Sequence, residues 1–274
     1  MNSRALKIYA WALGLAFLFC VAACAENTTD QPTPDAAKRF LKLRGYEFDE
    51  ESFFKAASEG DVMAVEGFIS AGININAKDR NDDTALVAAA ARGDAKIVDV
   101  LLRRGADVNA KGRNNWTALL LALQEDRSAV TDILLAHPAI DVKAETPERK
   151  SALMVAVWEQ YEPAVRILLQ RGVDVNHQDK DGDTALHGAA LYGNERILDL
   201  LLDAQANPNV KNKIGGTALM WAAAYGYDQI VQILLNRGAD PKIKDVDGVT
   251  AAGWAAKNGR GSLELLLRNA EKSQ

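Results

Sequence analysis

A phrase of 33 residues recurs along most of this 274-residue chain and constrains its fold more than any other feature. Its anchor is a Thr or Ser followed by Ala, and the successive anchors lie 33, 34, 33, 33 and 33 residues apart. A fixed period of this length indicates one small structural unit that is stacked repeatedly. One unit cannot bury its apolar face alone, so neighbouring units must share a continuous core. The anchors are Thr84, Thr117, Ser151, Thr184, Thr217 and Thr250.

Each period contains two short helical patterns. In "DDTALVAAAARGDAKIVDVLLRRGADVNAK", which begins at Asp82, apolar residues at 97, 98, 101 and 102 share one helical face. The opening Thr is a favoured N-cap residue, because its oxygen can accept an otherwise unpaired backbone N–H. Glycines are expected where the chain needs a positive φ. They separate the helices at Gly93, Gly193, Gly226 and Gly259 and end the second helix at Gly72, Gly105, Gly172 and Gly238.

These phrases resemble the ankyrin-repeat family. "TALHGAALYG" and "LLRRGADVN" nearly match the family phrases T-P-L-H-x-A-A-x-x-G and L-L-x-x-G-A-D-V-N, with Ala replacing Pro after the Thr. The match covers about seven units, from Glu50 to the end of the chain. The resemblance implies an all-α repeat solenoid, an ankyrin array of helix-turn-helix units joined by β-hairpin loops. It also implies a concave face lined by the first helices and the hairpin tips.

Both ends of the array are expected to be caps. A short helix is predicted over 35–43, followed by a helix with Asp49 as N-cap, where Phe53 and Phe54 cover the first interface. The charged C-terminal stretch "GSLELLLRNAEKSQ" suits a terminal repeat. We therefore assign residues 35–274 to the repeat domain with its caps. The polar, Pro-containing residues 25–34 are assigned to a flexible tether.

Residues 1–24 are predicted to be a signal peptide. Arg4 and Lys7 precede sixteen apolar or small residues, which suit a secretory signal better than a membrane span. Two cleavage interpretations remain open. "VAAC" resembles the lipobox of bacterial lipoproteins, in which Cys24 is lipidated, whereas "ACA" fits ordinary cleavage and a soluble chain from Glu26. Either interpretation predicts the periplasm, and the lipobox resemblance, with Ala25 after the cysteine, implies anchoring to the outer membrane.

The composition favours some partners and disfavours others. Beyond residue 24 the chain carries 30 basic and 37 acidic side chains, a net charge of −7, with no basic stripe. We therefore expect no nucleic-acid partner, and membrane contact only through the lipid anchor. Cys20 and Cys24 are the only cysteines, so we expect no disulfide, catalytic thiol or cysteine metal site in the mature array.

No set of residues predicts catalysis, a cofactor or a metal. The three histidines are scattered, and His187 occupies the position at which the family usually hydrogen-bonds within the hairpin turn. Asp179, Asp181 and Asp183 echo the start of a calcium loop, but the required later Gly and Glu are missing. We therefore predict structural roles for these residues, no catalytic residue, no cofactor and no enzyme activity.

The candidate binding residues are aromatic side chains on the expected concave face. Positions −1, +4, +7 and +8 relative to the anchor should lie at or near that face. Every tryptophan beyond the signal falls at one of these positions, as do two tyrosines. The candidate partner-binding residues are Trp116, Trp158, Glu159, Tyr192, Trp221, Tyr225 and Trp254.

These candidates divide into two groups. Trp221 and Trp254 lie at +4, where packing between adjacent first helices is the leading interpretation. Trp158, Tyr192 and Tyr225 lie at outward positions with less structural reason to be aromatic. Large exposed aromatics of this kind often dominate the binding energy of an interface. We therefore expect these three to contact a partner.

The middle of the array departs from the pattern. Asp126 and Gln160 replace the inter-helix glycine, and residues 137–139 replace the terminating one. Such losses should cost about 1 kcal/mol at each strained site, so we expect this region to open first. Two interpretations remain: drift in a tolerant loop, or a distinct hairpin from Thr146 to Lys150 that reaches toward the ligand.

Together these features predict a monomeric, non-catalytic module of the bacterial envelope that binds a protein through its concave face. Exported relatives lead us to expect either a scaffold for an envelope enzyme or an immunity-type inhibitor. A small-ligand or glycan receptor that uses the same aromatics is the alternative, and it would require a closed pocket.

Overall fold

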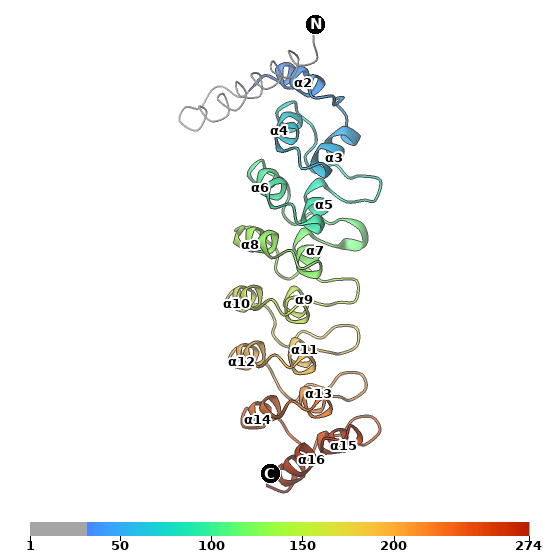
Figure 1. Cartoon of the computed structure of the whole chain (residues 1–274), viewed down its shortest axis with the longest axis vertical. Helices are drawn as coiled ribbons and strands as arrows, with labels where there is room; N and C mark the ends of the chain where they lie inside the picture. Colours follow the sequence, from blue (N-terminus) through green and yellow to red (C-terminus); the bar gives the residue numbers. More distant parts are fainter. Residues whose placement is uncertain (1–31, 274) are drawn as a thin grey trace.

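The computed structural model describes residues 32–273, so the predicted signal peptide and Cys24 lie outside the described residues. Within this range, fifteen α-helices form a single elongated stack (Figure 1). α2 (Pro34–Leu43) precedes seven helix pairs. The pairs are α3 (Glu50–Ser58) with α4 (Val62–Ser70), α5 (Ala85–Arg92) with α6 (Ala95–Arg103), α7 (Ala118–Gln124) with α8 (Ser128–Ala136), α9 (Ala152–Trp158) with α10 (Glu162–Gln170), α11 (Ala185–Tyr192) with α12 (Glu195–Asp203), α13 (Ala218–Tyr225) with α14 (Asp228–Asn236), and α15 (Ala251–Lys257) with α16 (Gly261–Ser273).

The first helix of each pair lies in one column and the second helix in another, with loops projecting beside the first column (Figure 1). We call these loops fingers 1 to 6; they span 78–84, 111–117, 145–151, 178–184, 211–217 and 244–250. Isolated β-bridges close the first three fingers, at Lys78–Thr84, Lys111–Thr117 and Glu145–Ser151. The predicted all-α solenoid with hairpin loops is therefore confirmed, although no strand is formed among the described residues.

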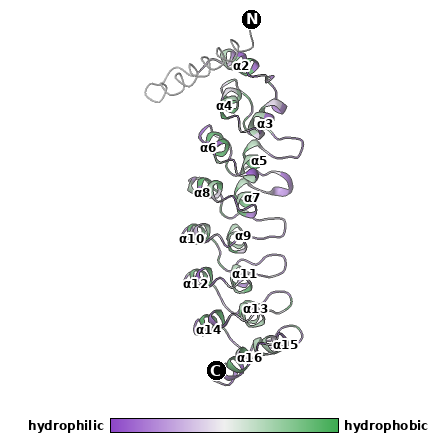
Figure 2. Cartoon of the chain, in the orientation of Figure 1, coloured by the Kyte–Doolittle hydropathy of each residue, from purple (hydrophilic) through white to green (hydrophobic). Residues whose placement is uncertain are grey.

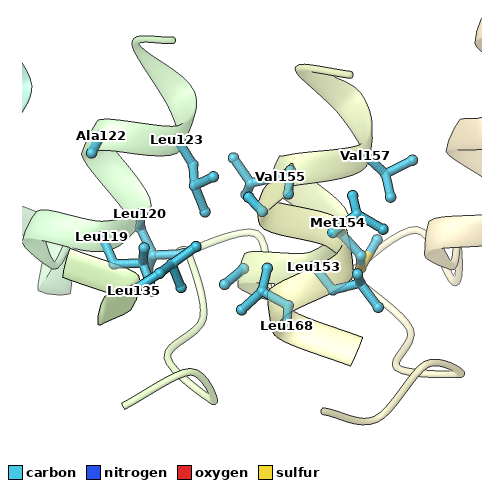
Figure 3. Packing of buried hydrophobic residues seen from close by; sticks show 14 of the residues in the cluster. Leu119, Leu120, Ala122, Leu123, Leu135, Leu153, Met154, Val155, Val157 and Leu168 are labelled. Atoms are coloured by element: carbon cyan, nitrogen blue, oxygen red, sulfur yellow. The ribbon is translucent and has the colours of Figure 1, made fainter. Parts of the chain in front are cut away.

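The core runs through the whole stack between the two columns. Around α7 to α10, Leu120, Leu123, Leu135, Leu153 and Leu168 are almost completely buried and face one another across the repeat boundary (Figure 3). Complete burial of one such leucine stabilises the fold by about 1.5–3 kcal/mol. Hydrophobic residues concentrate on the helices, whereas the loops are more hydrophilic (Figure 2). No helix among those described combines the length and the hydrophobicity needed to traverse a lipid bilayer.

The N-terminal cap forms as predicted. The Asp49 carboxylate accepts a hydrogen bond from the Ser52 backbone N–H at 2.7 Å and caps α3. Phe53 is fully buried, and its ring meets Phe68 edge-on at 5.8 Å between centroids, while Phe54 is partly buried against the same core. The cap therefore covers the first repeat with aromatic side chains.

The anchoring residues occupy N-cap positions, but their hydroxyl groups do not all make the expected bond. The hydroxyls of Thr84, Thr117 and Ser151 accept from the N–H three residues later at 3.3–3.4 Å. Those of Thr217 and Thr250 make no such bond. At these two positions the extended backbone alone marks the start of the helix.

The predicted strain in the middle repeats is present. Gly93, Gly193 and Gly226 end their helices at φ between 75° and 83°, in the left-handed region that suits glycine. Asp126 and Gln160 hold the equivalent positions at φ 51° and 55°. Both side chains therefore occupy a conformation that costs about 1 kcal/mol or more.

The C-terminal fingers are joined by a ladder of backbone hydrogen bonds. The N–H groups of Lys180, Lys213 and Val246 donate to carbonyls of the preceding finger at 2.8–3.0 Å. Gly182 and Gly215 allow the backbones to approach, because a Cβ at either position would lie 2.8–3.1 Å from the next finger. Fingers 3 to 6 are therefore tied edge to edge.

The ladder of backbone hydrogen bonds does not join fingers 2 and 3, because finger 3 lacks the required N–H donor. Pro147 occupies the donor position of finger 3 and has no N–H to give to finger 2. A polar cleft of about 390 Å³ lies here, lined by residues that include Asn114, Asn115 and Pro147. On its other side, finger 3 bonds to Lys180 in the same way as fingers 4 and 5 bond to their neighbours. The segment from Thr146 to Lys150 is therefore paired with finger 4 in the same way as the later fingers are paired with one another, and Thr146 is buried.

Candidate functional site

The candidate aromatics fall into three structural settings. Trp116 lies in finger 2, partly buried against the common core. Trp158, Trp221 and Trp254 are also partly buried and pack against that core. Only the two tyrosines of the set, Tyr192 and Tyr225, are exposed. The tryptophans therefore stabilise the stack, whatever else they contact.

Trp158 has a packing role that its position did not predict. A Cβ built on Gly188 would lie 2.7 Å from Cδ1 and Nε1 of Trp158, so the indole rests against the backbone of α11 in the next repeat. Its Nε1 is buried without a hydrogen-bond acceptor among the described residues. The Lys150 ammonium also lies 3.4 Å from the indole centroid. Trp158 thus contacts both a helix and a cation.

Trp221 and Trp254 pack against each other as expected for +4 positions. Their rings meet edge to face, with 5.3 Å between centroids. The Trp254 indole Nε1 donates to the Asp245 carboxylate at 2.7 Å, which ties α15 to finger 6. Burial tends to raise the pKa of Asp245, but hydrogen bonds from the Val249 N–H, the Trp254 indole and the Asp247 N–H outweigh it and lower that pKa. The carboxylate therefore stays ionised as the acceptor.

Tyr225 extends this cluster to the surface. Its ring lies 6.5 Å from Trp221 and stacks on Tyr227 with 6.1 Å between centroids and 11° between planes. Tyr227 in turn covers Gly193, where a Cβ would meet its ring at 2.8 Å. Sequence reasoning missed Tyr227. The sequence signal that could have identified it is a large residue ten positions after one anchor, opposite the glycine nine positions after the preceding anchor. Arg127 and Gly93 form the same pairing.

Two exposed apolar residues on the finger tips were also missed. Ile214 and Val246 are 47% and 69% exposed, and the N–H of the second donates to the carbonyl of the first at 3.0 Å. Tyr192 and Tyr225, at 44% and 48%, are exposed on the neighbouring first helices. Most other fingers carry Lys, Arg, Asp or Asn at the two tip positions, so alignment of the six fingers would have revealed them.

Glu159 sits in a negative environment at the end of α9. Burial, together with the charges of Asp126 and Glu125, raises the pKa of its carboxyl group, and Lys150 opposes this effect. The Gln124 amide donates to Glu159 Oε1 at 3.2 Å and links the two repeats. The α7–α9 segment of the array therefore concentrates negative charge beside Trp158.

His187 is part of the scaffold, as predicted. Its Nδ1 accepts from the Thr184 backbone N–H at 3.1 Å, so Nε2 carries the proton and donates to the Gly216 carbonyl at 3.2 Å. Burial lowers the pKa of His187, which favours this neutral tautomer, although Asp183 opposes the shift. Asp179 accepts from two backbone N–H groups of its own finger at 2.9 and 3.0 Å. The calcium-like phrase is therefore a hairpin turn.

Three clefts lie at the fingers, around Pro147, around Arg80 and around His177, and none of these three is lined by the candidate residues. Across residues 32–273, no three His, Cys, Asp or Glu side chains are grouped so that they could hold a metal ion. Tyr192 and Tyr225 line none of these three clefts.

Comparisons with known proteins agree with this architecture. The family model described as "Ankyrin repeats (3 copies)" matches residues 22–112, 53–146, 110–179, 153–245 and 186–274, which together span most of the chain. No curated protein matches the chain in sequence.

Two solved structures are similar along most of their length. The ankyrin repeat domain of Bcl-3, described as a unique member of the IκB protein family, is 28% identical with a TM-score of 0.68. That match covers 79% of this chain and 97% of the other. An ankyrin repeat domain from Acinetobacter baumannii AYE is 32% identical with a TM-score of 0.62, and the match covers 68% and 96% of the two chains.

Proposed function

Because this chain belongs to the ankyrin-repeat family, whose arrays generally act as protein–protein interaction modules, we propose that it binds a protein partner through its concave face. The first helices and the six fingers form that face. The binding is non-catalytic, in keeping with a family and fold that are typically not enzymatic. Affinity then depends on the side chains that the array displays.

One observation supports this proposal above the others. Tyr192 and Tyr225 lie at the same register of adjacent first helices and remain nearly half exposed, although neither is needed to fill the core. Ile214 and Val246 add apolar surface on the adjacent fingers. Tyrosines on a rigid scaffold contribute a large contact area at a low cost in conformational entropy.

The proposed location is the bacterial envelope. The basic and apolar residues before Cys24 support export, and the phrase around that cysteine supports a lipid anchor in the outer membrane. In that location the array would act as a scaffold for an envelope enzyme or as an immunity-type inhibitor. An ordinary signal cleavage would leave the same module soluble in the periplasm.

The proposal is tested by capture from envelope extract with the mature chain as bait. We expect the double variant Tyr192→Ala/Tyr225→Ala to lose at least tenfold in partner capture, since two interface aromatics often contribute above 1 kcal/mol each. Its midpoint of urea unfolding should stay close to that of the wild type. The control Leu43→Ala/Leu265→Ala removes two exposed leucines from α2 and α16 and should capture normally.

Equal capture by both variants would move the interface away from these tyrosines. Capture of nothing by the wild type would contradict the protein-binding proposal and favour the alternative, a small-ligand or glycan receptor. The alternative is weaker because the three clefts described above are lined by none of the candidate aromatics.

A further inference from the structure

The centre of the concave face already holds a cation. The Lys150 ammonium of finger 3 lies 3.4 Å from the centroid of the Trp158 indole, and its charge also acts on Glu159. The electron-rich face of an indole attracts cations, and a neighbouring carboxylate strengthens that attraction. Trp158 and Glu159 thus form a place for a positive charge, and Lys150 occupies it from within the chain.

The negative charge around this place exceeds what Lys150 can neutralise. Glu125 and Asp126 are exposed at the end of α7 and form no ion pair with any described residue. The Gln124 amide holds Glu159 next to them, and the C-terminal end of α7 adds its own partial negative charge. Glu125, Asp126 and Glu159 therefore form no ion pair among the described residues, and this unneutralised negative charge favours a cationic group of a partner.

This charged area adjoins the exposed tyrosines. Glu125, Glu159, Tyr192 and Tyr225 occupy the same +8 position in four consecutive repeats. Adjacent packed helices lie about 10 Å apart, so the face changes from acidic to aromatic over roughly one repeat. An extended chain advances about 3.3 Å per residue, and three residues therefore cover one repeat.

We propose that the partner presents an extended segment in which an Arg or Lys side chain binds over Trp158, attracted by the carboxylates of Glu125 and Glu159. About three to six residues away in that segment, an aromatic or aliphatic side chain packs on Tyr192 and Tyr225. This inference rests on the proposed function and specifies its ligand. Lys150 competes with the incoming cation in the free protein.

The test uses a phage-displayed library of random twelve-residue peptides, selected on the mature wild-type chain. Enriched peptides should share a basic residue and an aromatic or aliphatic residue at the proposed spacing. Glu125→Lys/Glu159→Lys should lose these peptides, whereas the matched control Glu195→Lys/Asp228→Lys, which reverses two exposed acids on α12 and α14, should retain them. If the reversed variant fails to fold by circular dichroism, Glu125→Gln/Glu159→Gln replaces it.

A single substitution separates recognition from structural support. Lys150→Ala removes the internal competitor, so synthetic copies of the enriched peptides should bind about two- to tenfold more tightly, the range expected for one cation–π contact. Unchanged or weaker binding by Lys150→Ala would refute the proposal that Lys150 competes with the incoming cation for Trp158. Peptides without a basic residue, or the absence of any enriched peptide, would overturn the proposed ligand.

The outcomes also separate this inference from the function on which it rests. Enriched peptides that lack basic residues but no longer bind to Tyr192→Ala/Tyr225→Ala would support binding at the concave face. They would refute the proposal that the ligand carries a basic side chain. Peptides that bind independently of both Glu159 and Tyr225 would refute both proposals.

Discussion

At the scale of single residues, the missing side chain of Gly188 decides where Trp158 lies. The indole occupies the volume that a Cβ at this position would need. The sequence placed Trp158 correctly on a first helix but indicated outward display, because position +7 taken alone does not show its neighbour at +4 of the next repeat. Packing across a repeat boundary depends on such pairs, and one repeat at a time does not reveal them.

This contact predicts that Gly188→Ala changes the free energy of unfolding differently in the presence and in the absence of Trp158. In the wild type, Gly188→Ala should destabilise the fold by about 1–3 kcal/mol, because the new Cβ displaces the indole. In a Trp158→Ala background the same change should be neutral or should stabilise by up to about 1 kcal/mol, since Ala is the better helix former. Urea unfolding of the four proteins measures both effects. Equal costs in the two backgrounds would show that the indole does not rest on Gly188.

His187 gives a second residue-scale prediction, in pH dependence. Burial lowers its pKa in the folded chain, so the unfolded chain binds the proton more readily and stability falls as the pH drops below 6.5, the ordinary value. Asp183, whose pKa burial raises, opposes this trend at lower pH. Between pH 7.5 and 5.5 we expect wild type to lose about 1 kcal/mol more than His187→Asn. Parallel urea midpoints for the two proteins across this range would contradict it.

At the scale of elements, the ends of the first helices vary from repeat to repeat. The glycines of the regular repeats end their helices without strain, whereas Asp126 and Gln160 hold the same left-handed turn. The sequence alone predicted this, because the 33-residue period identifies which positions should be glycine. The finger ladder could not be predicted in the same way, since its bonds join backbones. Once the ladder is known, its end at Pro147 follows from the sequence, because proline lacks the donor.

We expect Asp126→Gly/Gln160→Gly to stabilise the middle repeats by about 1 kcal/mol, since relief of strain outweighs the added flexibility of the unfolded chain. Hydrogen exchange of the α7 and α9 amides should slow correspondingly. The control Glu125→Gly changes a neighbour whose φ is −94° and should be destabilising. Faster exchange in the double variant would mean that these turns are not the weak point of the array.

At the scale of the whole molecule, the repeat period determined most of the architecture. It predicted the stack, the caps and the register in which Tyr192 and Tyr225 lie, because every repeat meets only its neighbours. The period alone did not indicate the exposed tips of Ile214 and Val246, which stand out only when the six finger sequences are aligned. The acidic and aromatic areas of the concave face likewise become continuous only when the first helices are placed side by side.

The claim that this face binds a protein is tested most directly by photo-crosslinking in living cells that express the chain. A photoreactive phenylalanine analogue placed at Tyr192 or Tyr225 should crosslink to one protein partner, and the same analogue at Asp228 on α14 should not. Both tyrosines are nearly half exposed, so the analogue should be accommodated without unfolding the array. Crosslinks from position 228 alone, with none from 192 or 225, would place the interface on the second helices and contradict the function proposed for the concave face.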